Sequence, residues 1–184
     1  MRITASCDKS YSPAFHSSGP RSINDITLIV LHDTEGGTAE SVAKYFQTKN
    51  AGGSAHLVVD NTSCYRCLPN AVIPWGAPGA NQQGFHIEQC GYASWSTRQW
   101  LRNIGTLRRA AYKTAQHCKA FHIPTRFLDA AALEAGRRGI TTHAEVSKWQ
   151  TAIHAPGDHS HTDPGSGWPR RVFMGLVRTY RARM

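Results

Sequence analysis

An almost continuous apolar segment that ends in polar residues constrains the fold of this chain most strongly. Residues 25–32 read DITLIVLH, a pattern typical of a β-strand buried on both faces. Such a strand needs a layer of structure on each side of its sheet. Similar strand patterns occur at residues 54–60 and 84–89, and residues 64–68 are expected to form a hairpin with the first of these. The sequence therefore predicts a central sheet.

Helical patterns alternate with these strands. Thr38 is expected to cap a short helix, residues 106–121 show the clearest helical period, and a final helix is expected from Pro169. Its inward side chains are predicted to be Val172, Phe173, Leu176, Val177 and Tyr180. Residues 74–83 and 144–167 are predicted to be loops. The alternation indicates an α/β fold in which helices flank a central mixed β-sheet.

The chain of 184 residues is long enough for one domain with a hydrophobic core. Residues 1–24 are rich in Ser, Pro and Gly and are predicted to be an irregular arm, so that the domain spans residues 25–184. No window approaches the ~18 apolar residues of a membrane span, and the first residues lack the apolar stretch of a signal peptide. Five cysteines, an odd number, argue against a fold held together by disulfides.

The charge is strongly positive, with 21 Lys and Arg against 12 Asp and Glu, a net charge of +9. Such a field concentrates a protein on polyanions, including nucleic acids and anionic cell-wall polymers. Nucleic-acid binding would favour basic residues interleaved with aromatic residues on one element. The arginines are instead spread over at least two predicted helices, so we do not expect a nucleic-acid partner.

Three residues that commonly bind metals lie at the ends of predicted segments: His32 after the first strand, His143 after residues 139–142, and Asp163 near the C-terminal helix. Two imidazoles and a carboxylate suit Zn²⁺, and three protein ligands leave a fourth position open for catalysis. A single histidine at a strand end is more often only hydrogen-bonded. With ten histidines in the chain, composition alone allows several such triples.

Five segments occur in an order that is characteristic of a known family: IVLHDTEG (29–36), SAHLVVD (54–60), GFHIEQCG (84–91), GITTHAEVS (139–147) and HTDPGSGWP (161–169). On these segments the chain resembles the type 2 N-acetylmuramoyl-L-alanine amidases, which include phage endolysins and peptidoglycan recognition proteins. The resemblance covers residues 26 to about 170. It implies a zinc amidase domain at residues 25–184.

The resemblance also implies roles for individual residues. His32, His143 and Asp163 match the zinc ligands of the family, and Glu88 matches the strand glutamate that serves as catalytic base. His161 stands where many members carry a catalytic lysine, and it could hydrogen-bond the developing oxyanion.

The segment before Asp163 is longer than in compact members of the family, and it carries His154 and His159 as rival ligands. The Pro-Gly turn that follows Asp163 matches the family and favours the aspartate. His56 follows an alanine where some members carry a tyrosine, which points to catalysis by Glu88 instead.

Trp75, His56 and Trp168 are the residues that we expect to contact substrate. Trp75 is followed by Gly76, where the family often has a Trp-His pair, so one histidine that contacts substrate is expected to be missing. Some of the five tryptophans are expected to be core residues instead.

Taken with the resemblance, the sequence predicts a zinc hydrolase that cleaves the bond between N-acetylmuramic acid and L-alanine in bacterial peptidoglycan. Without a signal peptide, it resembles a phage endolysin or its catalytic domain, held in the host cytoplasm until lysis. We expect a monomer that the positive charge directs to anionic cell-wall polymers. The alternative is a non-catalytic module that only binds peptidoglycan. All three ligand positions and Glu88 carry competent residues, which favours the enzyme.

Overall fold

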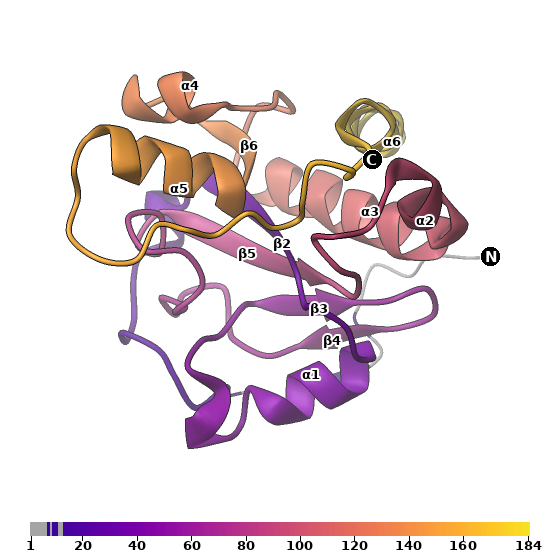
Figure 1. Ribbon diagram of the computed structural model, residues 1–184, viewed down its shortest axis with the longest axis horizontal. Helices are drawn as coiled ribbons and strands as arrows, with labels where there is room; N and C mark the ends of the chain where they lie inside the picture. Colours follow the sequence, from indigo (N-terminus) through magenta and orange to yellow (C-terminus); the bar gives the residue numbers. More distant parts are fainter. Residues whose placement is uncertain (1–6, 8, 11–12) are drawn as a thin grey trace.

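The computed structural model describes residue 7, residues 9–10 and residues 13–184. In this part of the chain, one domain is built around a mixed sheet of six strands in the order β1-β4-β3-β5-β2-β6 (Figure 1). The strands are β1 (Lys9–Ser10), β2 (Leu28–Asp33), β3 (Leu57–Val59), β4 (Cys64–Arg66), β5 (Gly84–Gln89) and β6 (Gly139–Thr142). All neighbouring pairs are parallel except β3 and β4, which form the predicted hairpin. The predicted α/β fold with a central mixed sheet is confirmed.

The helices are α1 (Ala39–Tyr45), α2 (Thr97–Arg102), α3 (Ile104–Ala120), α4 (Ala130–Glu134), α5 (His143–Ala152) and α6 (Arg170–Ala182), with short 3-10 turns η1 (Ile23–Asp25) and η2 (Lys49–Ala51). Thr38 caps α1 as predicted, because its side chain accepts a hydrogen bond from the backbone N–H of Ser41. Pro169 is the N-cap of α6 rather than its first residue, and Val172, predicted to face inward, is 42% exposed. No helix in the described residues is both long and apolar enough to cross a membrane.

Helices cover both faces of the sheet (Figure 1). On one face, alternate residues of β2, β3 and β5 form the largest core cluster with α3 and α6. On the other face, one smaller cluster packs under α1, and a second packs under α4 and α5. Successive side chains of a strand point to opposite faces, so these strands contribute side chains to the clusters on both faces of the sheet.

The structure corrects the prediction of a loop over residues 144–167. Helix α5 occupies the first part of this segment and begins directly after β6, where the Thr142 side chain accepts a hydrogen bond from the N–H of Glu145. The apolar periodicity of α5 is weak, because its buried residues include Ser147 and Gln150 as well as Val146. A helix with such a mixed buried face gives little signal in a pattern of apolar residues.

The expectation about cysteines is partly wrong. Cys7 and Cys64 form a disulfide that joins the N-terminal segment to β4, whereas Cys67, Cys90 and Cys118 are buried thiols. The odd cysteine count did not exclude a single bridge between distant segments. Residues 1–6, 8 and 11–12 of the predicted arm lie outside the described residues. Of the rest, β1 pairs with β4, and Ala14 donates a backbone hydrogen bond to Cys67, so this segment lies along the sheet.

Candidate metal centre and active-site cavity

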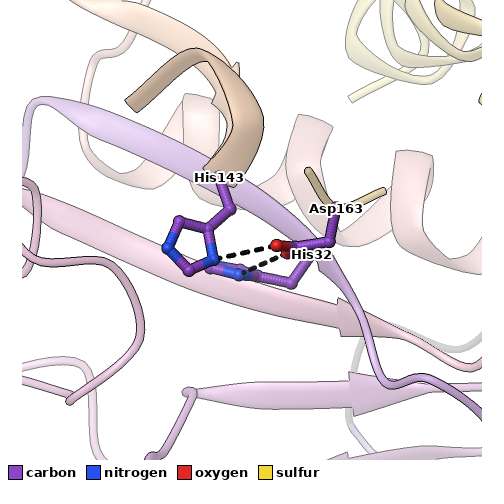
Figure 2. Close-up of side chains that lie close together, drawn as sticks. All are labelled: His32, His143 and Asp163. Atoms are coloured by element: carbon purple, nitrogen blue, oxygen red, sulfur yellow. Dashed lines mark hydrogen bonds and ion pairs between the residues drawn. The ribbon is translucent and has the colours of Figure 1, made fainter. Parts of the chain in front are cut away.

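Two neighbouring parallel strands bring His32 and His143 together. His32 lies near the carboxyl end of β2, and His143 begins α5 immediately after β6, the strand that pairs with β2. Asp163 lies between α5 and α6, 131 residues from His32 in the sequence. Figure 2 shows the three side chains pointing toward one another, with both imidazoles directed at the carboxylate. The sequence prediction that these residues meet is confirmed by the geometry.

The carboxylate of Asp163 bridges the two rings. Its Oδ2 lies 3.0 Å from Nδ1 of His32, and its Oδ1 lies 3.0 Å from Nδ1 of His143. Burial raises the pKa of Asp163, but the hydrogen bonds from His143 and His32 outweigh it and hold this pKa well below its ordinary value. Burial lowers the pKa of His143, although its bond to Asp163 partly opposes this. The carboxylate is therefore ionised at neutral pH, as a metal ligand must be.

The chemistry of these side chains fits a metal ion. Each residue offers one ligand atom, and the three atoms lie within 4.8 Å of one another. The imidazoles are 3% and 6% exposed at His32 and His143, and the Asp163 side chain is 14% exposed, so the cluster is enclosed but borders a cavity. Two nitrogens and one oxygen are a typical donor set for Zn²⁺. The cluster can hold such an ion and leave one position open to the cavity.

Glu88 lies beside the cluster on β5, in register with His32 on β2. Its carboxyl group borders the cavity, and its buried Oε2 has no hydrogen-bond partner among the described residues. Burial raises the pKa of Glu88 well above its ordinary value, and the negative charges of Asp163 and Asp33 raise it further. A carboxyl group with a raised pKa can both accept and return a proton near neutral pH.

A cavity of about 730 Å³ opens above the cluster. Its lining includes the segment after α1, the loop that carries Trp75, and residues 160–162 before Asp163. Trp75 is 45% exposed, donates a hydrogen bond from Nε1 to Ser18 Oγ, and stacks on His16 with 4.8 Å between ring centroids. This predicted substrate contact therefore lies on the cavity wall as an exposed aromatic surface.

His161, for which the resemblance implies a contact with the oxyanion, also borders the cavity. Its side chain is 44% exposed, and its ring stacks on that of His143 with 4.0 Å between centroids. Its Nδ1 lies 4.0 Å from Oδ1 of Asp163, farther than the ring nitrogens of the other two histidines. Partial burial and the nearby His143 lower the pKa of His161. The ring lies next to the cluster, where it can donate a hydrogen bond into the cavity.

Two predicted substrate contacts do not lie in the cavity. His56 is fully buried, and its Nδ1 accepts a hydrogen bond from the backbone N–H of His86. Trp168 is 7% exposed, packs on Phe173 and donates from Nε1 to Gln89. Both side chains are therefore core residues. The prediction was wrong because the sequence pattern placed these residues near the site but could not show which way their side chains point. We do not retain them as substrate contacts.

The rival ligands are also placed by the structure. His154 is exposed just beyond the end of α5, and Nε2 of His159 lies 3.2 Å from the backbone carbonyl oxygen of Pro156. Neither joins the cluster. Of the three candidates for the third ligand position, only Asp163 reaches the two ring nitrogens.

Sequence reasoning missed His86. Its Nδ1 lies 2.9 Å from Nε2 of His32, on the side of that ring opposite to Asp163. The signal was present, because His86 precedes Glu88 by two residues on one strand, and such residues share a face. Burial lowers the pKa of His86 well below its ordinary value, with a further contribution from the nearby His32. The ring is therefore neutral.

Comparison with known proteins assigns this arrangement to a family. Residues 22–166 match the family model described as N-acetylmuramoyl-L-alanine amidase, and this range contains Glu88 and all three residues of the cluster. The chain belongs to this amidase family. The family supports peptidoglycan amidase activity, in agreement with the resemblance found in the sequence motifs. No curated protein matches the sequence of this amidase.

Solved structures share its fold at low sequence identity. The Staphylococcus aureus hydrolase AmiA, solved with its ligand, has a TM-score of 0.74 and 16% identity, with 100% of this chain and 87% of that chain covered. PlyL has a TM-score of 0.60 and 18% identity, covering 96% and 97%. The amidase LysC from Clostridium intestinale has a TM-score of 0.60 and 14% identity, covering 95% and 99%. At these identities, the likeness concerns the fold.

Proposed function

We propose that this amidase is a zinc-dependent hydrolase that cleaves the amide bond between the lactyl group of N-acetylmuramic acid and L-alanine of the stem peptide. The observation that carries the proposal is the meeting of His32, His143 and Asp163 at one end of the cavity, with Glu88 beside them. The first three residues would hold Zn²⁺. We assign the catalytic domain to residues 25–184, and the preceding segment adds strand β1 to its sheet.

When bound, zinc would polarise the scissile carbonyl and lower the pKa of the attacking water. Glu88 borders the cavity with an unpaired carboxyl oxygen, and it takes the proton of this water as the new C–O bond forms. The same carboxyl group then gives a proton to the L-alanine nitrogen as the C–N bond breaks. His161 donates a hydrogen bond to the carbonyl oxygen, which gains negative charge in the transition state.

The exposed face of Trp75 supplies an apolar surface for a sugar ring or peptide at the cavity wall. The net charge of +9 directs the protein to anionic polymers of the bacterial wall. We infer a lytic role, as a phage endolysin or its catalytic domain that reaches peptidoglycan from the host cytoplasm through a membrane lesion made by another protein.

Digestion of purified peptidoglycan with and without a chelator tests the proposal. We expect new L-alanine amino termini, no new reducing sugar ends, and loss of activity on chelation that added zinc restores. His143→Ala should lose both bound zinc and turnover, whereas the control His154→Ala should keep both, because His154 lies outside the cluster.

New reducing ends, or full activity in the presence of the chelator, would contradict the proposal. Binding to peptidoglycan with no cleavage in the presence of zinc would identify a recognition module instead.

A further inference from the structure

A third histidine, His86, contacts the metal-binding cluster through His32. His86 is fully buried on β5, and its ring stacks on that of His32 with 5.1 Å between centroids and 23° between planes. Its Nδ1 lies 2.9 Å from Nε2 of His32, whose Nδ1 contacts Asp163. His32 is thus held at both ring nitrogens, by a carboxylate on one side and an imidazole on the other.

Two glycines make room for the ring of His86. A Cβ atom at Gly76 would lie 2.4 Å from Nδ1 of His86, and one at Gly84 would lie 2.4 Å from its Nε2. Neither glycine has a positive φ, so the backbone conformation does not require glycine at these positions. The requirement is for space, since any side chain at Gly76 would collide with the nitrogen that faces His32.

The backbone of His86 is held as well. Its N–H donates to Nδ1 of His56, which is fully buried, and β5 is paired on both sides in the middle of the sheet. These contacts leave the ring of His86 little freedom. A group that must direct another side chain needs this kind of fixed position.

We propose that His86 is a positioning residue that orients His32 and selects its tautomer for metal binding. A neutral imidazole carries one N–H, and Nδ1 of His32 can bind a metal only when the proton is on Nε2. With the metal bound, Nδ1 of His86 would accept this Nε2–H, whereas without the metal the hydrogen bond to Asp163 places the proton of His32 on Nδ1. Ligating histidines commonly donate their second N–H to an acceptor of this type, most often a carboxylate or a carbonyl. Here the acceptor is an imidazole from the neighbouring strand. The inference rests on the proposed zinc site.

Zinc affinity, measured by competition with a chromophoric chelator, tests this role without substrate. His86→Leu removes the acceptor, and we expect zinc to bind about 10- to 100-fold more weakly. His86→Asn keeps an acceptor oxygen near the position of Nδ1, and its affinity should stay within about threefold of the wild type. The visible spectrum of the Co²⁺-loaded protein should change in the Leu variant and be largely retained in the Asn variant.

A second variant tests the same contact with His86 in place. Gly76→Ala pushes the ring away from His32, and it should weaken zinc binding in the wild type but not further in His86→Leu. Gly175→Ala is the matched control, because a Cβ atom there meets nothing within 4 Å and its φ is not positive. If His86→Leu fails to fold, Gly76→Ala and His86→Asn decide the question.

Two results would overturn the inference. If the wild type binds zinc and the Leu and Gly76→Ala variants bind it equally well with an unchanged Co²⁺ spectrum, His86 is only a packing residue and the proposed function stands. If the wild type binds no zinc, both proposals fail.

Discussion

The two faces of strands β2 and β5 differ sharply although their residues alternate along the same backbone. The face toward α3 and α6 is apolar and fully buried, and it carries Ile29, Leu31, Phe85 and Ile87. The opposite face, near the carboxyl ends of the strands, carries His32, His86 and Glu88. The first face supplies the largest apolar core, whereas the second adds apolar contacts at Leu28 and Val30 and holds polar groups at fixed positions near the strand ends.

This difference has an energetic consequence. In the described part of the chain, three buried side-chain atoms without a hydrogen-bond partner lie at or beside the site, namely Asp33 Oδ2, His86 Nε2 and Glu88 Oε2, and three more lie in α2 and α3, namely Trp100 Nε1, Thr114 Oγ1 and Gln116 Oε1. Each such atom costs about 1–3 kcal/mol of stability. The apolar face offsets this cost, so substitutions on the two faces should separate activity from stability.

The largest effect is expected at Glu88. Glu88→Gln keeps the shape of the side chain but cannot accept a proton, so turnover on peptidoglycan should fall about 10²- to 10⁴-fold. Zinc content and melting temperature should stay close to those of the wild type, because Glu88 is not in the ligand cluster. Release of L-alanine amino termini measures the first quantity. Retained turnover would show that the base lies elsewhere.

On the apolar face, Leu107→Ala in α3 should act on stability alone. Leu107 is fully buried in the core shared by α3 and the sheet, and its truncation should lower the free energy of unfolding by about 2–5 kcal/mol. Urea unfolding measures this loss. Turnover per folded molecule should not change. A fall in turnover under conditions where the variant is fully folded would show that the two faces are coupled.

The smallest effect concerns a titratable group on the apolar face. His117 stacks on Phe85 with 4.0 Å between centroids, and burial lowers the pKa of His117 to about 4. As the pH falls, His117 is therefore protonated first in the unfolded chain. The free energy of unfolding should fall by up to about 3 kcal/mol between pH 6.5 and pH 4.

Urea unfolding of the wild type and His117→Phe across this pH range isolates the contribution, because His56 and His86 also have lowered pKa values and are present in both proteins. We expect a shallower loss of stability in the variant. Identical pH profiles would mean that the pKa of His117 is the same in the native and the unfolded state.

Local patterns predicted much of this structure. The strand at residues 84–89 and the cap at Thr38 match β5 and α1, because apolar runs and capping residues act over a few neighbours. The same reasoning missed α5, whose buried face mixes apolar and polar residues, and α2 and α4, which have five or six residues each. Short or mixed helices are stabilised by tertiary packing more than by their own pattern.

The sequence by itself determined the four strands β2 to β5, the alternation of their side chains and, through the family motifs, which histidines and which aspartate to consider. The tertiary structure alone decided that Asp163 rather than His154 or His159 meets His32, that Trp168 points into the core, and that His86 lies under the cluster. The alternation of side chains is a local property of the backbone. Which distant segments meet at a strand end depends on how all the layers pack together.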